Sequence, residues 1–267
     1  MVMLKELMNL SRRRVMITGA TGGIGQKMAE TVAEMGGNLV LVDRPGSDYS
    51  TVIQSVDDLG KVEINQIDCD LENSDSRDQL IESLLSNEKG LDVLINNAAF
   101  VGTSGLEGWV TSFEEQSIET WRRAVEVNLT AAFDLSKGLY PKLKQSGHGA
   151  IVNVASIYGI SGPDYSLYED TAMGNPAAYA ASKGGLLQLT KWLATTLAPE
   201  VRVNAISPGG VFRNQPEMFV DRYQNRTPLK RMAVEDDFKG VTAYLISDLS
   251  GYMTGQNMVI DGGWTSW

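Results

Sequence analysis

Short runs of apolar residues recur along the chain and alternate with longer segments in which apolar positions follow a helical spacing. The helical segments include residues 26–35, 113–143 and 179–197. The runs that predict strands are residues 15–17, 38–43, 91–95, 150–155, 201–206 and 257–260, and residues 62–67 alternate like a further strand. Strands that alternate with helices form a doubly wound parallel sheet with right-handed crossovers and helices on both faces. We therefore predict an α/β fold with a parallel sheet of about seven strands.

Length and composition favour one domain. The chain has 267 residues and no proline-rich linker, charge block or repeat, so we expect residues 1–267 to form a single domain. The net charge of −10 argues against nucleic acid as a partner, because binding to a phosphate backbone needs clustered Lys and Arg. No apolar run is long enough for a membrane span, and the basic residues 12–14 follow the apolar N-terminal residues, which is the wrong order for a secretory signal. A cytoplasmic protein without a membrane partner is the expectation.

The scarcity of cysteine and histidine disfavours several kinds of chemistry. Cys69 is the single cysteine, which excludes an internal disulfide and a metal site with several cysteine ligands. His148 is the single histidine, and its setting in Ser-Gly-His-Gly-Ala is typical of a turn. Catalysis by Ser-His-Asp or Cys-His groups is therefore disfavoured, and we predict no metal site.

A glycine-rich segment joins the first predicted strand to the first predicted helix. It reads Thr-Gly-Ala-Thr-Gly-Gly-Ile-Gly from Thr18 to Gly25. Strand, glycine-rich turn and helix in this order can bind a phosphate, because glycines let the backbone approach a pyrophosphate whose charge is met by the helix N-terminus. A turn without a ligand is the alternative. The segment predicts a Rossmann-type, NAD(P)-binding fold with cofactor contacts from Gly19, Thr21, Gly23, Ile24 and Gly25.

An acidic residue ends the second predicted strand and bears on the choice of cofactor. Asp43 follows the glycines by about 20 residues, where a carboxylate accepts hydrogen bonds from the adenosine ribose hydroxyls and repels a 2′-phosphate. Arg44 acts in the opposite direction, because a guanidinium there can accommodate a 2′-phosphate. Since Ala20 and Thr21 add no second cation, we predict NAD as the cofactor.

Further candidate cofactor contacts follow the third and fourth predicted strands. Asp70 is placed to accept a hydrogen bond from the adenine amino group, and the alternative is an N-cap for the helix that follows Asn73. After the fourth strand come Asn97, Ala98 and Ala99, where small side chains suit a close approach of the backbone to a cofactor. Asparagines at the end of a strand are also common turn formers.

Tyr179 and Lys183 lie four positions apart in a predicted helix and so share one of its faces. A tyrosine with a pKa of about 10 is almost entirely protonated at neutral pH, but a fixed ammonium beside it favours the phenolate. With its pKa lowered by Lys183, Tyr179 would exchange a proton with an alcohol or a ketone. Tyr-x-x-x-Lys is common on amphipathic helices, so its meaning depends on the rest of the chain.

Other candidates lie at predicted strand ends or inside a helix. Ser156 follows the fifth strand, and Pro208-Gly209 follow the sixth. Ligands of an open parallel sheet bind beyond the carboxyl ends of its strands, so these residues are expected on one edge with the glycine-rich turn and Asp43. Asn128 lies inside a predicted helix, which indicates a local distortion of the helix or a held water.

Taken together and in order, these motifs resemble those of the classical short-chain dehydrogenases/reductases over essentially the whole chain. The matching segments are residues 18–25, 70–71, 96–99, 128, 156, 179–183, 207–209 and 254–264. The resemblance implies that Ser156 hydrogen-bonds the substrate oxygen, that Tyr179 is the acid/base, and that Lys183 binds the nicotinamide ribose. It implies that Asn128 holds a water linking Lys183 to solvent. It also implies a homotetramer or homodimer, with cofactor contacts from Leu71, Pro208, Gly209 and Val211, the last at the nicotinamide amide.

Three departures from the family pattern stand out. Residues 96–99 read Asn-Asn-Ala-Ala where Asn-Asn-Ala-Gly is more usual, and residues 208–213 lack the threonine that often contacts the pyrophosphate or the amide. The connection from Ser156 to Tyr179 is longer than is usual in the family. Its glycines and prolines predict a structured loop beside the nicotinamide. Tyr168 is nearer the usual spacing for the base, but Ala172 stands where its lysine should be.

These features predict an NAD(H)-dependent oxidoreductase that interconverts a secondary alcohol and a ketone on a polar substrate. A sugar derivative is favoured because the long connection is polar, and its sequence looks like a subgroup associated with bacterial surface-sugar and flagellin-glycan pathways. A 3-oxoacyl reductase or a polyol dehydrogenase is the alternative, and a catalytically silent NAD-binding regulator is an alternative of another class. Arg213, Arg222 and Arg226 could meet an anionic substrate, or could equally lie on solvated helix faces or at subunit contacts.

Overall fold

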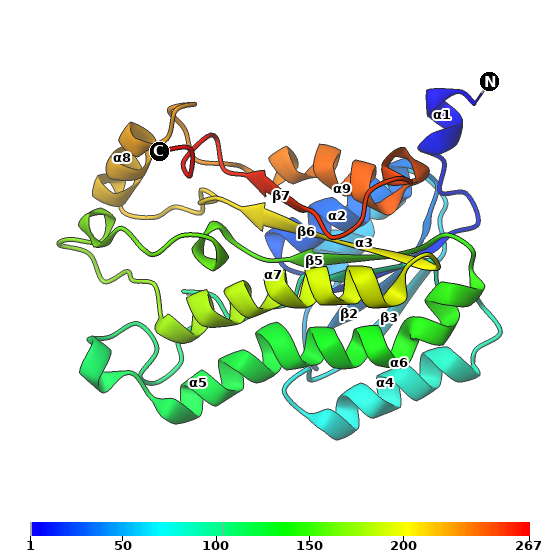
Figure 1. Ribbon diagram of the computed structural model, residues 1–267, viewed down its shortest axis with the longest axis horizontal. Coiled ribbons are helices and arrows are strands. Elements are labelled where there is room, and N and C mark those ends of the chain that lie inside the picture. The colour runs from blue at the N-terminus through cyan, green and yellow to red at the C-terminus, as the bar shows by residue number, and fades with distance from the viewer. Residues whose placement is uncertain (1, 103) are drawn as a thin grey trace.

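The computed structural model describes residues 2–102 and 104–267, which fold around a parallel sheet of seven strands (Figure 1). The spatial order is β3-β2-β1-β4-β5-β6-β7, and all neighbours are parallel. The strands are β1 (Arg14–Thr18), β2 (Asn38–Asp43), β3 (Ile64–Asp68), β4 (Val93–Asn96), β5 (Gly149–Val154), β6 (Val201–Pro208) and β7 (Asn257–Ile260). The predicted fold class is confirmed. The strand order reverses between β1 and β4, the place where doubly wound sheets bind their ligands.

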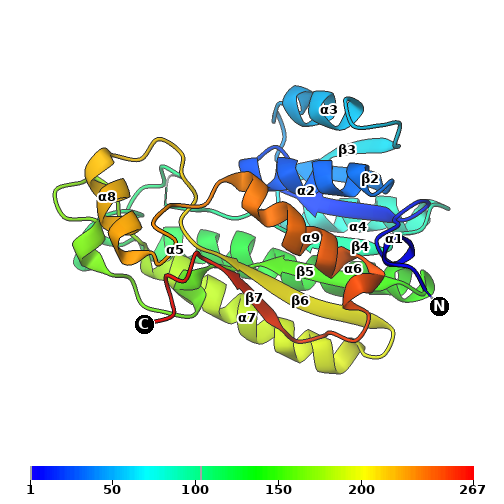
Figure 2. The same ribbon diagram turned by 90° about the horizontal axis from the view of Figure 1, so that it is seen from above.

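Helices cover both faces of the sheet, as predicted. They are α1 (Leu4–Leu7), α2 (Gly23–Glu34), α3 (Ser50–Asp57), α4 (Ser74–Ser86), α5 (Ile118–Val125), α6 (Ala131–Gln145), α7 (Ala177–Leu197), α8 (Glu217–Arg226) and α9 (Lys239–Ile246). Figures 1 and 2 show α2, α3 and α9 on one face and α4, α5, α6 and α7 on the other. In the two described ranges, no helix is both long and apolar enough to cross a membrane.

The sheet carries an apolar core on each face because successive strand side chains point in opposite directions. Val15 and Ile17 pack with residues of α2 and α9, whereas Met16 packs with residues of α4, α6 and α7. All three side chains are fully buried. Burial on both faces explains why central strands such as β1 and β4 read as continuous apolar runs, whereas the partly exposed edge strand β3 does not.

The predicted helical segment 113–143 is divided in the structure. Residues 113–115 form a single 3₁₀ turn, and α5 begins only at Ile118, where the Ser117 side chain accepts a hydrogen bond from the Thr120 N–H at 3.3 Å. A serine that caps a helix in this way marks the N-terminus of the helix. Residues 126–130 then form a π-helical turn between α5 and α6. The prediction of one continuous helix from residue 113 is therefore wrong.

The long connection between β5 and α7 forms a structured loop, as its glycines and prolines predict. Between Ser156 and α7 it contains only two single 3₁₀ turns, Ile157–Gly159 and Tyr165–Leu167. We call residues 160–176 the insert. Both views place the insert beside α8, beyond the carboxyl ends of the strands (Figures 1 and 2).

Candidate active site

The glycine-rich turn is held tightly against the end of β4. Gly19 has a φ of +64°, and a Cβ on it would lie 2.9 Å from the Cα of Ala98. A Cβ on Gly25 would lie 2.2 Å from the carbonyl oxygen of Gly19. Side chains at these positions would push the turn apart. The glycines therefore allow the first turn of α2, which starts at Gly23, to present its free N–H groups close to the turn.

Thr18 and Asn97 join the carboxyl ends of β1 and β4. The Thr18 hydroxyl accepts hydrogen bonds from the N–H groups of Asn97 at 3.0 Å and Ala98 at 3.1 Å. The Asn97 side-chain amide donates to the carbonyl oxygens of Thr18 and Gly19, both at 3.0 Å. Asn97 thus fixes the shape of the glycine-rich turn, a role that matches the turn-forming alternative. Ala98 and the adjacent Ala99 keep the strand end small, as expected.

Asp43 lies at the end of β2 and holds the neighbouring loops through its two carboxylate oxygens. One oxygen accepts from the Thr21 N–H at 2.9 Å and from the Thr21 hydroxyl at 2.8 Å. The other accepts from the Arg44 N–H at 2.9 Å and from the Ser47 hydroxyl at 3.2 Å. The carboxylate is therefore positioned beside the glycine-rich turn, as the spacing predicted.

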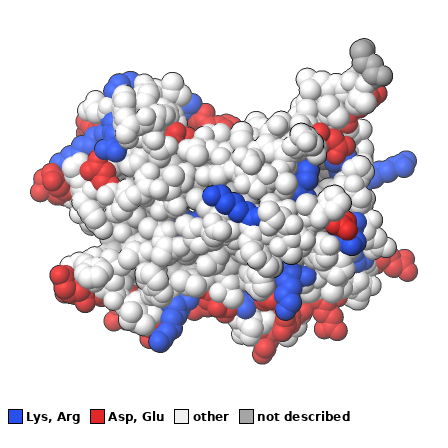
Figure 3. All heavy atoms as spheres, in the orientation of Figure 1, with Lys and Arg blue, Asp and Glu red and all other residues white. Residues whose placement is uncertain are grey.

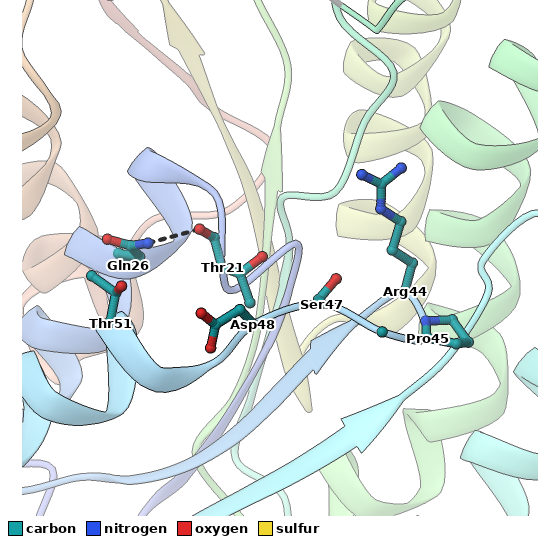
Figure 4. Close-up of a pocket in the computed structure, with 8 residues that line it drawn as sticks. Thr21, Gln26, Arg44, Pro45, Ser47, Asp48 and Thr51 are labelled. Atoms are coloured by element: carbon teal, nitrogen blue, oxygen red, sulfur yellow. Dashed lines mark hydrogen bonds between the residues drawn. The ribbon is translucent and has the colours of Figure 1, made fainter.

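A pocket of about 770 Å³ opens between the glycine-rich turn and the loop after β2. Figure 4 shows Gln26 and Thr51 on one side of it and Arg44 with Pro45 on the other. Gln26 donates a hydrogen bond to the carbonyl oxygen of Thr21 at 2.7 Å. The Arg44 side chain is exposed and makes no hydrogen bond or ion pair within the described residues. The volume is in the range of small-molecule pockets. Gln26 was not among the predicted site residues, because a glutamine in a first helical turn carries no distinctive signal.

Asp70 is exposed and does not cap a helix. The N-cap of α4 is Asn73, whose side-chain oxygen accepts from the N–H groups of Asp75 at 2.8 Å and Ser76 at 3.2 Å. The alternative interpretation of Asp70 as an N-cap is therefore wrong. Asp70 accepts a local hydrogen bond from the Glu72 N–H at 3.0 Å. The side chain of Leu71 is buried in the core.

Asn128 lies in the π-helical turn between α5 and α6, so the predicted helix distortion is confirmed. Its side-chain oxygen accepts from the Phe100 N–H at 2.7 Å. Its amide group donates to the Phe100 carbonyl at 3.2 Å and to the Ser182 hydroxyl at 3.1 Å. Asn128 thus connects the residue after Ala99 to α7. Both amide protons are used in protein contacts, so the predicted role of its side chain as a water ligand stays a prediction.

Ser156, Tyr179 and Lys183 come together where β5 ends and α7 begins. Ser156 is buried two residues after β5, and its hydroxyl oxygen accepts from the Tyr158 N–H at 3.1 Å. Tyr179 and Lys183 lie one turn apart in α7, with the Lys183 Nζ 5.8 Å from the centre of the Tyr179 ring. The Lys183 Nζ donates to the carbonyl oxygen of Val154 at 2.6 Å. The sequence prediction that these side chains converge is consistent with this geometry.

The electrostatic environment of the pair differs from the prediction. Burial raises the pKa of Tyr179, and the Ser156 hydroxyl and the Arg213 guanidinium act in the opposite direction. Burial lowers the pKa of Lys183 to about 7. The predicted lowering of the tyrosine pKa by Lys183 is thus not found among the described residues. The physical reason is that the ammonium is itself desolvated and is directed to the Val154 carbonyl.

The residues after β6 lie at the same edge of the sheet, the one formed by the carboxyl ends of the strands. Pro208 ends β6, and the Gly209 N–H donates to the Ile260 carbonyl at 2.9 Å. Val211 pairs with Ala233 in an isolated bridge, which brings the segment that contains Glu235 over the start of α2.

Glu235 is a site residue that sequence reasoning missed. Its carboxylate oxygen lies 2.7 Å from the place where a Cβ of residue 23 would stand, against Gly23 at the start of α2. The same oxygen accepts from the Arg213 Nε at 3.0 Å. Glu235 and Arg213 are far from the glycine-rich turn in sequence, so no local pattern could indicate the contact of Glu235 with Gly23.

The other two arginines singled out in the sequence fasten the insert to α8. Arg226 pairs with Asp164 of the insert at 2.6 Å. Arg222 donates to the carbonyl oxygen of Glu169 and lies 3.9 Å from the Asp170 carboxylate. Both arginines are thus engaged in contacts within the chain.

Tyr168 is not positioned on α7 as Tyr179 is, so the structure does not support it as the alternative base. It lies in the insert, outside α7, and its hydroxyl pairs with that of Tyr158.

Comparisons with known proteins agree with this geometry. The sequence model of a family described as enoyl-(acyl carrier protein) reductase matches residues 19–265. The chain is 32% identical over 262 residues to a probable galactose dehydrogenase from Rhizobium meliloti, which covers 96% of each chain. It is 27% identical over 257 residues to the post-translational flagellin modification protein A of Campylobacter coli, covering 96% of this chain and 99% of that protein.

A solved structure shares both fold and sequence. It is a short-chain dehydrogenase from Leptospira borgpetersenii with bound NAD+, which matches with a TM-score of 0.84 and 34% identity. The match covers 99% of this chain and 97% of that one. The family match over most of the chain, together with the serine, tyrosine and lysine at the sheet edge, leads to one conclusion. The chain belongs to the classical short-chain dehydrogenase/reductase family and is an oxidoreductase that uses a nicotinamide cofactor.

Proposed function

We propose that the protein interconverts a secondary alcohol and a ketone on a polar substrate, with NAD(H) as the cofactor. The observation that carries this proposal is the meeting of two hydroxyls and an ammonium at one strand end. Ser156 lies beside the Tyr179 phenol, and Lys183 follows one turn later on the same helix. A proton donor, a second hydroxyl and a nearby cation are the groups that transfer of a proton to or from an alcohol oxygen requires.

In the proposed mechanism the chain positions the substrate oxygen and moves its proton. The bound nicotinamide supplies or accepts the hydride. Tyr179 takes the proton from the alcohol oxygen in oxidation and returns it in reduction, while Ser156 donates a hydrogen bond to the same oxygen. The Lys183 Nζ, held by the Val154 carbonyl, lies 5.8 Å from the centre of the Tyr179 ring, where it would bind the nicotinamide ribose.

The residues at the sheet edge fit a dinucleotide. The glycine-rich turn can stay this tight only because Gly19 and Gly25 lack a Cβ, and a tight turn of this kind lets the backbone approach a pyrophosphate. Asp43 stands at the adenosine end, where its carboxylate can accept hydrogen bonds from ribose hydroxyls and would repel a 2′-phosphate. The exposed guanidinium of Arg44 beside the same pocket favours NADP instead. We propose NAD because Asp43 is fixed in place by four hydrogen bonds, whereas Arg44 is not held.

A sugar derivative is the proposed substrate. Two relatives support this choice, the probable galactose dehydrogenase and the flagellin modification protein. The insert also supports it, because it is polar and contains two tyrosines and three carboxylates, Tyr165, Tyr168, Asp164, Glu169 and Asp170. A 3-oxoacyl reductase or a polyol dehydrogenase is the second candidate, favoured by the description of the matching family.

We also propose that the protein forms a homo-oligomer. Large apolar side chains are exposed on α5, α6, α7 and β7, among them Trp121 (39%), Phe133 (40%), Trp192 (53%) and Val259 (39%). Figure 3 shows that charged side chains lie mainly around the rim of the face that carries α7 and β7, and that its centre is uncharged apart from a basic side chain. Uncharged patches with exposed aromatic residues are typical of subunit interfaces. Light scattering after gel filtration would give the molar mass, and a monomer would contradict the proposal.

The proposed function is tested by following NADH absorbance with a panel of sugars, polyols and ketones in both directions. We expect turnover with at least one polyhydroxylated compound, and loss of that turnover in Tyr179→Phe. NADH binding without any hydride transfer across a broad panel would favour a catalytically silent, NAD-binding regulator.

A further inference from the structure

The insert is joined to α8 and the C-terminal segment by a cluster of aromatic rings. The ring of Tyr168 lies 5.5 Å from that of Phe219 on α8, and the ring of Tyr158 meets that of Trp264 edge-on at 6.3 Å. Leu167 and Tyr223 are buried in the same cluster. Packing of this kind holds the two phenols of Tyr158 and Tyr168 in fixed positions.

The hydroxyls of Tyr158 and Tyr168 form a hydrogen bond with each other. Within the described residues, neither hydroxyl has a second hydrogen-bond partner. Two phenols carry two protons, and one proton is enough for the bond between them. One O–H donor therefore remains without a partner within the described residues, in a pair that is partly buried. A ligand oxygen or a water can accept from it.

The backbone that carries Tyr158 lies next to the catalytic groups. Tyr158 follows Ser156 by two residues, and its N–H donates to the Ser156 hydroxyl oxygen. The chain then packs onto α7, since a Cβ on Gly159 would lie 2.8 Å from the carbonyl oxygen of Lys183. Burial raises the pKa of Tyr168 to about 12, and the charge of ionised Tyr179 adds to this rise. Burial also raises the pKa of Tyr158, with contributions from Tyr168 and Tyr179.

Further unpaired donors belong to the aromatic cluster, the insert and α8. The indole Nε1 of Trp264 and the side-chain amide nitrogen of Asn175 are buried and lack a hydrogen-bond partner within the described residues. Trp264 and Asn175 are only 2% and 8% exposed. The Nε of Arg226, whose guanidinium lies 4.4 Å from the centre of the Trp264 ring, also has no partner there. Donors in excess of acceptors match a ligand that is rich in oxygen atoms.

We propose that the Tyr158–Tyr168 hydroxyl pair is a specificity-determining site that donates a hydrogen bond to a second substrate oxygen, on the carbon next to the reacting one. The preferred substrates are then vicinal diols and the matching hydroxyketones, the chemistry of a sugar or polyol, and not isolated alcohols. This inference rests on the proposed function. A site that hydrogen-bonds a hydroxyl discriminates strongly against an analogue that lacks it, because its own donor is then left unpaired.

The test compares cyclohexanol with cis-1,2-cyclohexanediol, which differ by one hydroxyl on the adjacent carbon. For the unmodified protein with NAD we expect kcat/KM to be at least tenfold higher for the diol, after allowance for its two equivalent hydroxyls. In the double variant Tyr158→Phe with Tyr168→Phe, the preference should fall to within about twofold. Replacing both partners of a buried hydrogen bond with groups of the same shape is nearly neutral for folding, so this variant is expected to fold. Tyr165→Phe, which changes an exposed phenol of the same insert, is the matched control and should keep the preference.

The ratio of the kcat/KM values for the two alcohols separates a loss of specificity from a structural defect, because a structural defect lowers both values together. Equal efficiencies for diol and cyclohexanol in the unmodified protein, or an unchanged preference in the double variant, would overturn the hydroxyl site. Absence of turnover with both alcohols would count against the proposed function. In that case calorimetric titration of each alcohol into the protein with NADH decides the inference, and a diol that binds no tighter than cyclohexanol overturns it.

Discussion

The ammonium of Lys183 donates a hydrogen bond to the carbonyl oxygen of Val154, the last residue of β5, at 2.6 Å. This contact fixes the register of α7 against β5. Because Ser156 follows Val154 by two residues and Tyr179 precedes Lys183 by one helical turn, the same contact sets the position of both hydroxyls. The lysine is therefore a structural link as well as a charge beside the phenol.

Removing the phenol oxygen should abolish turnover and leave cofactor binding nearly intact. We expect Tyr179→Phe to reduce kcat by at least a hundredfold, in line with the loss of an acid/base group of about 10²–10⁴-fold effect. The affinity for NADH, measured by fluorescence titration, should change by no more than a few-fold. Substantial residual turnover would place the acid/base role on another residue.

The buried Lys183 should make the stability of the protein rise with pH. Its pKa is lowered to about 7 in the folded protein, whereas an unfolded lysine keeps its proton up to about pH 10. Between these values the unfolded state binds more protons, so the free energy of unfolding increases with pH. We expect a contribution of about 2 kcal/mol between pH 7 and pH 9, before buried tyrosines begin to ionise.

Urea denaturation at pH 7, 8 and 9 measures this contribution. Lys183→Met removes the titrating group and should lack the increase that the unmodified protein shows. If the free energy of unfolding changed with pH in the same way in both proteins, Lys183 would have an ordinary pKa. The same variant should lose both turnover and NADH affinity, because one side chain serves both.

Asp43 should set the choice between the two dinucleotides. Asp43→Ala removes the ribose hydrogen bonds and the repulsion of a 2′-phosphate together, so we expect the preference for NAD over NADP to shrink by at least tenfold. The ratio of kcat/KM values for the two cofactors measures it. Thr21→Val is a control that loses one hydroxyl bond to Asp43 but keeps the carboxylate. An unmodified enzyme that already prefers NADPH would show that Arg44 dominates.

Glu235 should weaken cofactor binding by placing a negative charge at the start of α2. Its carboxylate lies against Gly23, where the helix N-terminus favours an anion. Glu235→Gln should therefore tighten NADH binding by about twofold to fivefold, the usual range of one charge near a helix end. Asp236→Asn changes the same charge on an exposed neighbour and is the matched control. An equal change of NADH affinity in both variants would mean that the net charge of the protein, and not the position of Glu235, causes the effect.

Shortening the insert should impair the use of substrate and spare the cofactor. Deletion of residues 162–172 removes Leu167 and Tyr168 from the aromatic cluster and Asp164 from its ion pair with Arg226. We expect NADH affinity to persist and kcat/KM for the natural substrate to fall at least tenfold, about 1.4 kcal/mol of transition-state binding. Circular dichroism checks that the shortened protein folds. Full efficiency in a folded, shortened enzyme would contradict a role for the insert.

The local sequence alone determined the strands, the glycine-rich turn and the helix that carries Tyr179 and Lys183. Buried parallel strands need continuous apolar runs, a tight turn needs glycine at Gly19, and two residues four apart in a helix must share a face. These requirements act over a few residues, so they can be read from a short window. The π-helical distortion at Asn128 was indicated in the same way, by a polar residue in an unfavourable place.

Only the tertiary structure decided the contacts between distant segments. The pairing of Arg226 with Asp164 makes a helix after β6 support a loop after β5, and Glu235 reaches Gly23 across most of the chain. The direction of the Lys183 and Tyr179 pKa shifts was decided in the same way, because burial depends on what packs around a side chain and not on its neighbours in sequence. Contacts and desolvation of this kind arise from packing between elements, for which a single sequence holds no local signal.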